Sequence, residues 1–356
     1  MSIPYGHQSI NDDDVRAVVD SLSSDWLTMG PRVTEFESAI AAVANAPGAV
    51  AVTSGTAALH AAYAAMRLEP NADVVVSPLT FVATASTAIQ CGAKIRFADV
   101  QEDTGNIDPE IVASMVTPQT RVVSAVDYAG HPADLDELAA IVRKSGALLL
   151  EDAAHSIGSL YRGRAVGEIA DITAFSFFPT KNLTSAEGGA VVSTDADLLE
   201  RARSFRSHGL VRNKEQQRYP DEGPWHQEVH QLGLNYRLPD VLSALGSSQI
   251  SRLQQFKESR TRVFARYVEG LGDVQGITLP TQRDYVDPMW HLFPVRVHDG
   301  RRREVFDYLR ANGVLVQVNY IPAYWHPYFE DLGYQRGMCP VAERYYSEEI
   351  SLPMFA

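Results

Sequence analysis

The chain has 356 residues, of which 45% are hydrophobic and 21% are charged, and its formal net charge is -13. This length predicts two domains, because single hydrophobic cores stop growing at about 250–300 residues. The acidic balance argues against nucleic acid or an anionic membrane as the main partner, since both attract clustered lysine and arginine. It does not exclude a small anionic ligand, which binds local backbone amides.

The two cysteines and the N-terminal stretch bear on the cellular compartment of the protein. Cys91 and Cys339 lack the spacing of a metal site and cannot form a disulfide framework,. The opening residues MSIPYGHQSIN have neither the charged nor the apolar region of a signal peptide, and no apolar run reaches 18 residues,. We therefore expect a cytoplasmic protein with no membrane-spanning segment.

The first fifty residues predict two helices. Asn11, followed by three aspartates, is typical of a helix N-cap with acids in the first turn, and the helix should run to Leu22,. Pro31 follows Gly30 and should occupy the first position of a second helix that ends near Ala44,.

A strand and a helix with a Gly-containing turn between them come next. The strand at 49–52 leads into Thr53-Ser54-Gly55-Thr56, and an alanine-rich helix is expected at 57–66. Glycine permits a tight turn, and the free amides of a helix N-terminus attract anions. The pattern indicates an anion site, although an unoccupied strand-to-helix turn would look the same.

Strands and helices then alternate, which predicts an α/β fold. We expect strands at 73–77, 94–98 and 121–126, and helices at 80–90 and 109–115. Such alternation is typical of a mostly parallel central sheet sandwiched by helices. Binding residues in these sheets gather at the carboxyl ends of the strands. The residues expected to converge there are Thr56, Phe81, Asp152, Ser176 and Lys181.

The stretch from Leu148 to Val192 carries the chemistry. Asp152 ends an apolar run, and Lys181 lies in a loop rich in serine and threonine. Pyridoxal phosphate enzymes need these two groups: the lysine forms a Schiff base with the cofactor aldehyde, and the carboxylate keeps the pyridine nitrogen protonated. The pair alone is a weak signal, because most lysines are simply solvated.

The same stretch resembles the DegT/DnrJ/StrS family of sugar aminotransferases, which are fold-type I pyridoxal phosphate enzymes. The family pattern E-D-A-A-[HQ], S-F-H-P-T-K-N-L-T and E-G-G matches residues 151–155, 176–184 and 187–189. Phe178 replaces the histidine of that pattern. The resemblance covers nearly the whole chain and implies pyridoxal 5'-phosphate as cofactor.

The resemblance also implies cofactor contacts beyond the acid and the lysine. Gly55, Thr56 and Ser176 would bind the phosphate. Phe81 would stack on the pyridine ring, and His155 would lie beside the cofactor's 3-oxygen. Without the resemblance, Phe81 would equally suit a protein core and His155 would be a structural histidine.

Two segments resemble substrate-binding parts of the family. Tyr5 lies in the N-terminal segment that closes over the substrate mouth, and Tyr320 lies in a motif where Asn319 replaces the family histidine. Asn235, at the end of a long polar insertion, would reach across a homodimer interface to the phosphate in the partner's site.

The C-terminal part of the chain predicts a smaller α+β domain. A long helix should run from Pro239 to about Leu271, followed by strands at 289–297 and 314–318 around a helix at 301–312. We expect a large domain at 1–238 and a small one at 239–356. The last helix of the relatives is expected to be missing after Ala356.

The predicted reaction is the transfer of an amino group from L-glutamate to a nucleotide-linked keto-deoxy-sugar. The N-terminal stretch IPYGHQSI resembles the branch that makes pseudaminic acid, which implies UDP-4-keto-6-deoxy-N-acetylhexosamine. A dTDP-linked 3- or 4-keto-sugar is the alternative substrate. Sugar dehydratases of the family replace the lysine with histidine, so Lys181 argues against dehydration. A non-catalytic regulator is disfavoured because Asp152, Lys181 and Asn235 are all retained.

Overall fold

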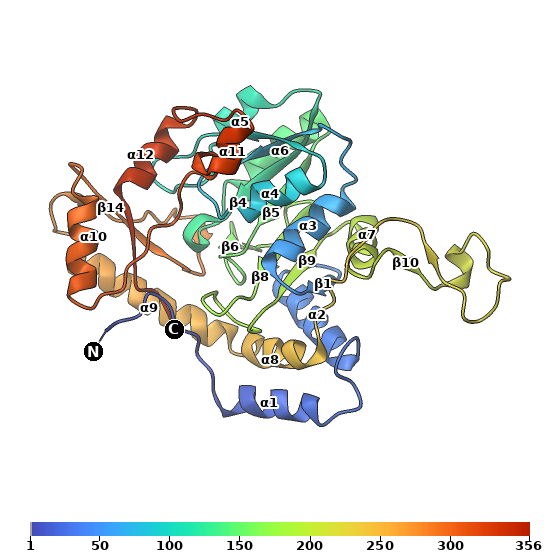
Figure 1. Ribbon diagram of the computed structural model, residues 1–356. Coiled ribbons are helices and arrows are strands. Elements are labelled where there is room, and N and C mark those ends of the chain that lie inside the picture. The colour runs from blue at the N-terminus through green and yellow to red at the C-terminus, as the bar shows by residue number, and fades with distance from the viewer. Residues whose placement is uncertain (1) are drawn as a thin grey trace.

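The computed structural model describes residues 2–356 (Figure 1). Seven strands in this range form a central sheet in the order β1-β9-β8-β5-β4-β2-β3. β9 is antiparallel to both of its neighbours, and the other neighbouring strands are parallel. The predicted mostly parallel sheet is confirmed. The strands are β1 (Ala49–Val52), β2 (Asp73–Val76), β3 (Lys94–Phe97), β4 (Thr120–Val126), β5 (Leu148–Asp152), β8 (Ile172–Ser176) and β9 (Gly189–Val192).

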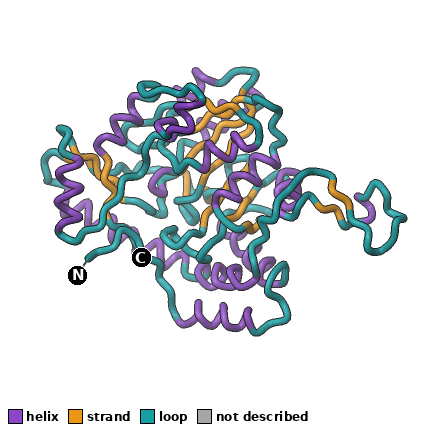
Figure 2. Tube along the Cα trace, viewed as in Figure 1, coloured by secondary structure: helices purple, strands orange, loops and turns teal. Residues whose placement is uncertain are grey.

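Helices cover both faces of the sheet, as Figure 2 shows. Successive side chains of a strand point to opposite faces. Val74 and Val76 of β2 accordingly pack with α3 and α4, whereas Val75 packs with α5 and α6. The helices of this part are α2 (Pro31–Val43), α3 (Gly55–Ala65), α4 (Ala83–Gln90), α5 (Pro109–Met115), α6 (Leu135–Ser145) and α7 (Ala196–Arg206), with a 3-10 turn at Tyr128–Gly130.

Local sequence signals explain where several helices begin. α1 (Asp12–Leu22) starts at a capping box, in which Asn11 and Asp14 bond to each other's backbone amides,. α2 has Pro31 at its first position. Several boundaries differ from the prediction: the helix expected at 57–66 is Gly55–Ala65, and the strand expected at 289–297 is only Phe293–Val297. The helix expected at 80–90 starts only at Ala83, so Phe81 lies in the preceding loop.

The long helix expected from Pro239 to Leu271 is two helices, α8 (Asp240–Ile250) and α9 (Leu253–Leu271). α8 packs against α1 and α2. α9 continues after a short break toward the C-terminal strands (Figure 1).

The C-terminal part contains a small antiparallel sheet of β12 (Ile277–Thr278), β14 (Phe293–Val297) and β15 (Glu349–Leu352), with α10 (Arg302–Ala311) beside it. The strand predicted at 314–318 is wrong. This segment makes only isolated bridges, from Val314 to Ile3 and from Gln317 to Ser351. Burial of Val316 accounts for the apolar pattern that suggested a strand. Two isolated bridges do not make a strand.

The last hundred residues do not all pack with the small sheet. α11 (Pro327–Asp331), α12 (Pro340–Glu348) and a 3-10 turn at Ala323–Trp325 contribute to the same apolar cluster as α3 and α4. A second small sheet joins β13 (Val286–Asp287) to β6 (Leu160–Tyr161) and β7 (Arg164–Ala165). The domain boundary at residue 238 stays a prediction.

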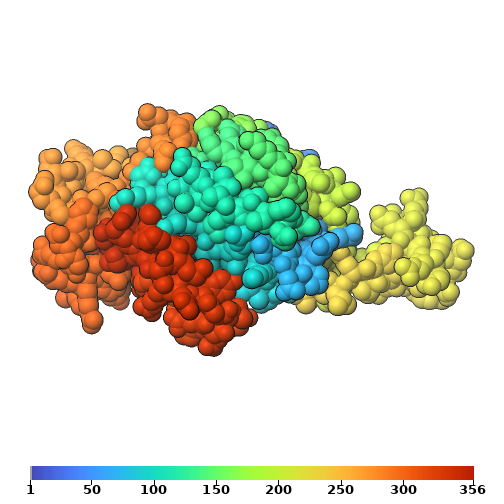
Figure 3. Space-filling view, turned by 90° about the horizontal axis from the view of Figure 1, so that it is seen from above, coloured from blue at the N-terminus to red at the C-terminus, as the bar shows by residue number. Residues whose placement is uncertain are grey.

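A two-stranded arm projects from the body of the molecule (Figures 1 and 3). It consists of β10 (Leu210–Val211), a 3-10 turn at Lys214–Gln216 and β11 (Glu228–Val229). Apolar side chains on and next to it face solvent: Trp225 is 80% exposed and Leu232 is 90% exposed. None of the helices in residues 2–356 is long and apolar enough to cross a membrane.

Candidate active site

A cavity of about 560 Å³ lies where β1, β4, β5 and β8 end. This is the edge of the sheet, at the carboxyl ends of the parallel strands, where the sequence predicts that the binding residues gather. Nine of the ten candidate site residues line it: Tyr5, Gly55, Thr56, Phe81, Asp152, His155, Ser176, Lys181 and Tyr320.

Asp152 is the last residue of β5 and is only 5% exposed. Its Oδ2 accepts a hydrogen bond from Thr84 Oγ1 at 2.6 Å, and its Oδ1 accepts one from the backbone amide of Ala154 at 3.2 Å. Burial raises the pKa of Asp152, whereas these two bonds and the charge of Lys181 oppose the rise. The carboxyl is held in one orientation at the floor of the cavity.

Lys181 lies in the loop between β8 and β9, and its backbone amide donates to the carbonyl of Phe178 at 2.9 Å. Burial lowers its pKa to about 8, and Asp152 opposes this shift. An amine in this environment is neutral far more often near pH 7 than an exposed lysine is. Neutrality is what a nucleophile or a general base requires.

The turn between β1 and α3 forms the anion-binding end of the cavity. The side chain of Ser54 caps α3 by accepting from the amide of Ala57 at 3.1 Å. Gly55 and Thr56 are the first two residues of the helix, where backbone amides lack intrahelical partners,. A Cβ on Gly55 would lie 2.7 Å from Cβ and Oγ of Ser176, so only glycine fits there.

Aromatic and imidazole side chains form another wall. Phe81 is 60% exposed, and its ring centroid lies 6.4 Å from that of Tyr320. The hydroxyl of Tyr320 lies 3.1 Å from Nε2 of His155. Nδ1 of His155 is buried and has no hydrogen-bond partner among the described residues. A buried ring nitrogen without a protein partner fits a ligand atom.

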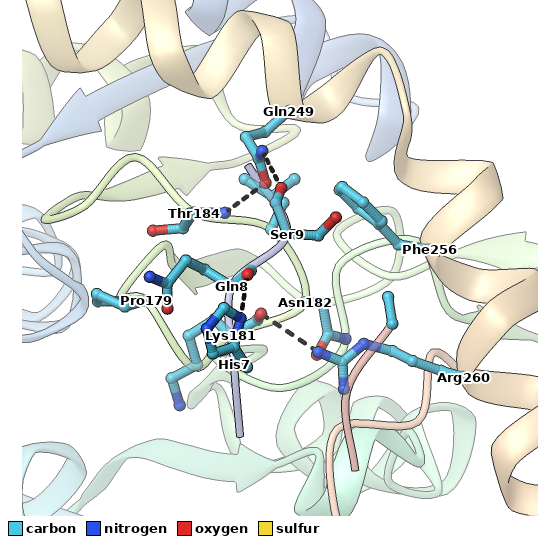
Figure 4. Close-up of a pocket in the computed structure, with 12 residues that line it drawn as sticks. His7, Gln8, Ser9, Pro179, Lys181, Asn182, Thr184, Gln249, Phe256 and Arg260 are labelled. Carbon is cyan, nitrogen blue, oxygen red and sulfur yellow. Dashed lines mark hydrogen bonds between the residues drawn. The ribbon is translucent and has the colours of Figure 1, made fainter. Parts of the chain in front are cut away.

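The loop that carries Lys181 is supported from behind, as Figure 4 shows. The side chain of Gln249 donates to the carbonyl of Ser9 at 2.9 Å and accepts from the amide of Thr184 at 3.4 Å. Arg260 donates to the carbonyl of Lys181 at 3.4 Å. The N-terminal segment and the helices α8 and α9 thus hold the loop in place.

Asn235 is not brought to this cavity. It is exposed at the base of the arm, where it forms an isolated bridge with Ser207. Two of the cavity residues that sequence reasoning missed are Thr84, which donates to Asp152, and His291, which contacts Asn182. Thr84 lies on the first turn of α4, and no sequence pattern distinguishes it from Thr87, the other threonine of that helix. His291 precedes β14 and belongs to none of the sequence motifs that predict the site.

The comparisons with known proteins agree with this geometry. Residues 8–356 match the model of the DegT/DnrJ/EryC1/StrS aminotransferase family. The chain belongs to this family. Its enzymes are pyridoxal phosphate-dependent sugar aminotransferases, so the predicted family, fold and aminotransferase class are confirmed, as is the cofactor at the level of the family.

The chain is similar to several family members along almost its full length. It is 36% identical to the spore coat polysaccharide biosynthesis protein SpsC of Bacillus subtilis over 99% of the chain and 92% of that protein. It is 34% identical to the UDP-4-amino-4,6-dideoxy-N-acetyl-beta-L-altrosamine transaminase of Campylobacter jejuni over the same shares. The chain also resembles the solved structure of Helicobacter pylori PseC, an aminotransferase involved in the biosynthesis of pseudoaminic acid. The match covers 100% of this chain and 94% of the PseC chain, with a TM-score of 0.92 and 30% sequence identity.

The residues of the cavity suit pyridoxal phosphate. The backbone amides at Gly55 and the hydroxyl of Ser176 can donate hydrogen bonds to a phosphate,. The buried Nδ1 of His155 has no protein partner among the described residues and can bond to a polar ligand atom, and the carboxyl of Asp152 can pair with a ring nitrogen,. The amine of Lys181 lines the same cavity. No feature of this site conflicts with the cofactor of the family.

Proposed function

We propose that this protein transfers an amino group from L-glutamate to a UDP-linked 4-keto-6-deoxy-N-acetylhexosamine. The observation that carries the proposal is the placement of Lys181, with a depressed pKa, in one cavity with the buried carboxyl of Asp152. Pyridoxal phosphate, when bound, supplies an aldehyde that accepts the amino group and a ring that withdraws electrons.

The proposed roles of the residues follow from where they lie. Gly55, Thr56 and Ser176 hold the phosphate, and Phe81 orients the ring by stacking, which contributes about 1 kcal/mol beyond area burial. Asp152 faces the ring nitrogen, where a positive charge would favour the ionised form of its buried carboxyl.

Lys181 acts twice in this proposal, first as the nucleophile that holds the cofactor and then as the group that moves a proton. A proton must pass between the α-carbon of the donor and the carbon of the cofactor aldehyde. An amine whose pKa is lowered to about 8 is suited to both tasks, since it is neutral for part of the time at physiological pH and still basic enough to accept a proton,.

Similarity to the Campylobacter transaminase and to PseC supports the UDP-sugar as acceptor. Tyr5 and Tyr320 are the residues that we propose to contact it. A dTDP-linked 3- or 4-keto-sugar is the second candidate acceptor.

A regulatory protein without catalysis is the third candidate. The chain is 33% identical to a pleiotropic regulatory protein of Geobacillus stearothermophilus, over 98% of the chain and 91% of that protein. The retained Asp152 favours catalysis, because a protein that only binds the cofactor needs no buried carboxylate to keep the ring an acceptor of electrons.

The acceptor can be identified directly. The protein is first converted with L-glutamate to its amino form, excess donor is removed, and a panel of UDP- and dTDP-linked 3- and 4-keto-sugars is added singly. We expect the UDP-linked 4-keto-6-deoxy-N-acetylhexosamine to restore the absorbance of the aldehyde form fastest and to yield an aminated sugar by mass spectrometry. Faster restoration by a dTDP-linked sugar would reject the proposed acceptor in favour of the second candidate.

A further inference from the structure

The segment Met289–His291 forms the wall behind the active-site lysine. His291 lines the cavity and is only 6% exposed. Its backbone amide donates to the carbonyl of Ala129 at 2.8 Å. Gly130 makes this approach possible, since a Cβ there would lie 2.2 Å from the carbonyl oxygen of Met289. The segment is therefore fixed by the neighbouring loop.

Asn182, the residue after the lysine, is bonded to this wall in one orientation only. Its Nδ2 donates to the carbonyl oxygens of His155 at 2.8 Å and Met289 at 2.9 Å. Carbonyl oxygens only accept, so the side-chain amide cannot be turned round. Oδ1 must then accept the hydrogen bond from Nδ1 of His291 at 3.2 Å. His291 carries its proton on Nδ1.

The environment of His291 keeps this tautomer. Its ring packs against the ring of His155, with centroids 4.3 Å apart and planes at 36°. Burial lowers the pKa of His291 well below its ordinary value, and the nearby His155, Lys181 and Arg260 lower it further. The ring stays neutral near pH 7, so Nδ1 remains a constant donor to the loop.

Arg260 also bonds to the main chain at Lys181 (Figure 4). One guanidinium nitrogen donates to the carbonyl of Trp290 at 3.1 Å and the other donates to the carbonyl of Lys181 at 3.4 Å. Asn182, Arg260 and residues 289–291 together form what we call the lysine clamp. The clamp bonds the carbonyl of Lys181 to Arg260 and the side chain of Asn182 to residues 289–291.

We propose that His291 is a positioning residue of the transamination site: its Nδ1 proton locks Asn182, and Asn182 sets the direction in which Lys181 enters the cavity. This inference rests on the proposed role of Lys181 and deepens it. The amine must reach the cofactor and later a carbon-bound proton, and a misplacement of 1 Å costs on the order of a hundredfold in rate. Without the Nδ1 proton of His291, Oδ1 of Asn182 has no donor, and the side chain of Asn182 no longer fixes the loop that carries Lys181.

Two substitutions separate the hydrogen bond from the ring. His291→Asn keeps an N–H close to the place of Nδ1, whereas His291→Phe keeps a ring against His155 but removes the donor. In the pyridoxal phosphate-loaded protein we would measure the pH midpoint of the visible absorbance band, and kcat and KM with L-glutamate. We expect the midpoint of His291→Asn to stay within about 0.3 units of wild type and that of His291→Phe to move by about 1 unit, with kcat lowered about 10–100-fold and KM changed less than about threefold.

Controls distinguish this inference from the proposed function. His298→Phe removes a histidine whose Nε2 meets Thr278 Oγ1 at 2.9 Å, outside the cavity lining, and should leave the band unchanged. If wild type shows no band that depends on Lys181, the proposed function fails. If wild type shows it but His291→Phe titrates like wild type, or His291→Asn is as impaired as His291→Phe, the positioning role alone is overturned.

A second variant covers the case in which His291→Phe does not fold. Asn182→Ala breaks the same lock from the other side and should reproduce the shift of the midpoint and the loss of kcat. Adding His291→Leu, which removes the Nδ1 donor, to Asn182→Ala should then change neither quantity, since residues that act through one bond are not additive,. A further loss in the double variant would overturn the role of His291.

Discussion

Lys181 and Asp152 illustrate how burial in one cavity shifts the pKa values of an amine and a carboxyl in opposite directions. Burial penalises the charged form of each group, which lowers the pKa of the amine and raises that of the carboxyl,. Each charge partly offsets the penalty on the other. The Thr84 hydroxyl adds a hydrogen bond that keeps the buried Asp152 closer to its ionised form.

Removing that hydroxyl tests its contribution. Thr84→Val should raise the pKa of Asp152 further and lower kcat by about 10–100-fold, because a hydrogen bond to a charged group contributes about 1.5–3 kcal/mol. Steady-state kinetics with L-glutamate would measure this. Thr87→Val is the matched control, since Thr87 on the same helix donates only to the carbonyl of Ala83. Equal kcat values for the two variants would mean that Thr84 does not tune Asp152.

The pKa of Lys181 predicts how the cofactor-free protein captures pyridoxal phosphate. With a pKa of about 8, the neutral fraction of the amine rises about fivefold from pH 7 to pH 8 and less than twofold from pH 8 to pH 9,. The capture rate, followed by stopped-flow absorbance, should show the same levelling. A rate that rises about tenfold per pH unit through pH 9 would indicate an ordinary lysine pKa.

The turn between β1 and α3 combines a helix N-terminus with a close approach to β8. Gly55→Ala should weaken cofactor binding at least about tenfold, because the new methyl group would push Ser176 and the helix apart,. Titration of the cofactor-free protein would measure the affinity. Gly270→Ala on α9 is the control: its Cβ meets nothing within 4 Å, so affinity should not change and stability should rise by up to about 1 kcal/mol,. Unchanged affinity in Gly55→Ala would remove the turn from the cofactor site.

Much of this arrangement could be predicted from the sequence because its signals are local. The strand at 49–52, the caps of α1 and α2 and the alternation of strands and helices are each encoded in short stretches, and parallel topology then brings the strand ends together. The break between α8 and α9 and the bridges of residues 314–318 depend on packing with distant elements. Thr84 and His291 were missed for the same reason, since their partners lie 68 and 109 residues away along the chain.

The projecting arm bears on whether one active site is built from one chain or from two. Asn235 lies at its base, exposed and outside the cavity lining of its own chain. The homodimer expected from the family would bring it to a partner's phosphate. The exposed Trp225 and Leu232 suit burial in such an assembly, because large apolar side chains that cluster on a surface mark interaction sites,.

Mixing two inactive variants tests this arrangement. Lys181→Ala and Asn235→Ala subunits, unfolded and refolded together, should recover up to about a quarter of wild-type activity, because half of randomly formed dimers would contain one intact site out of two. Each variant refolded alone supplies the background. No recovery in the mixture, with dimers present by sedimentation, would show that Asn235 does not complete a neighbour's site.

The most direct test of the proposed reaction is the visible absorbance of the purified protein with pyridoxal phosphate, before and after L-glutamate is added, with Lys181→Ala measured alongside. We expect a band that depends on Lys181 and that collapses to the amino form of the cofactor with glutamate. A band that is present without Lys181, or that no amino donor changes, would contradict transamination by this cavity and would favour a protein that binds the cofactor without using it.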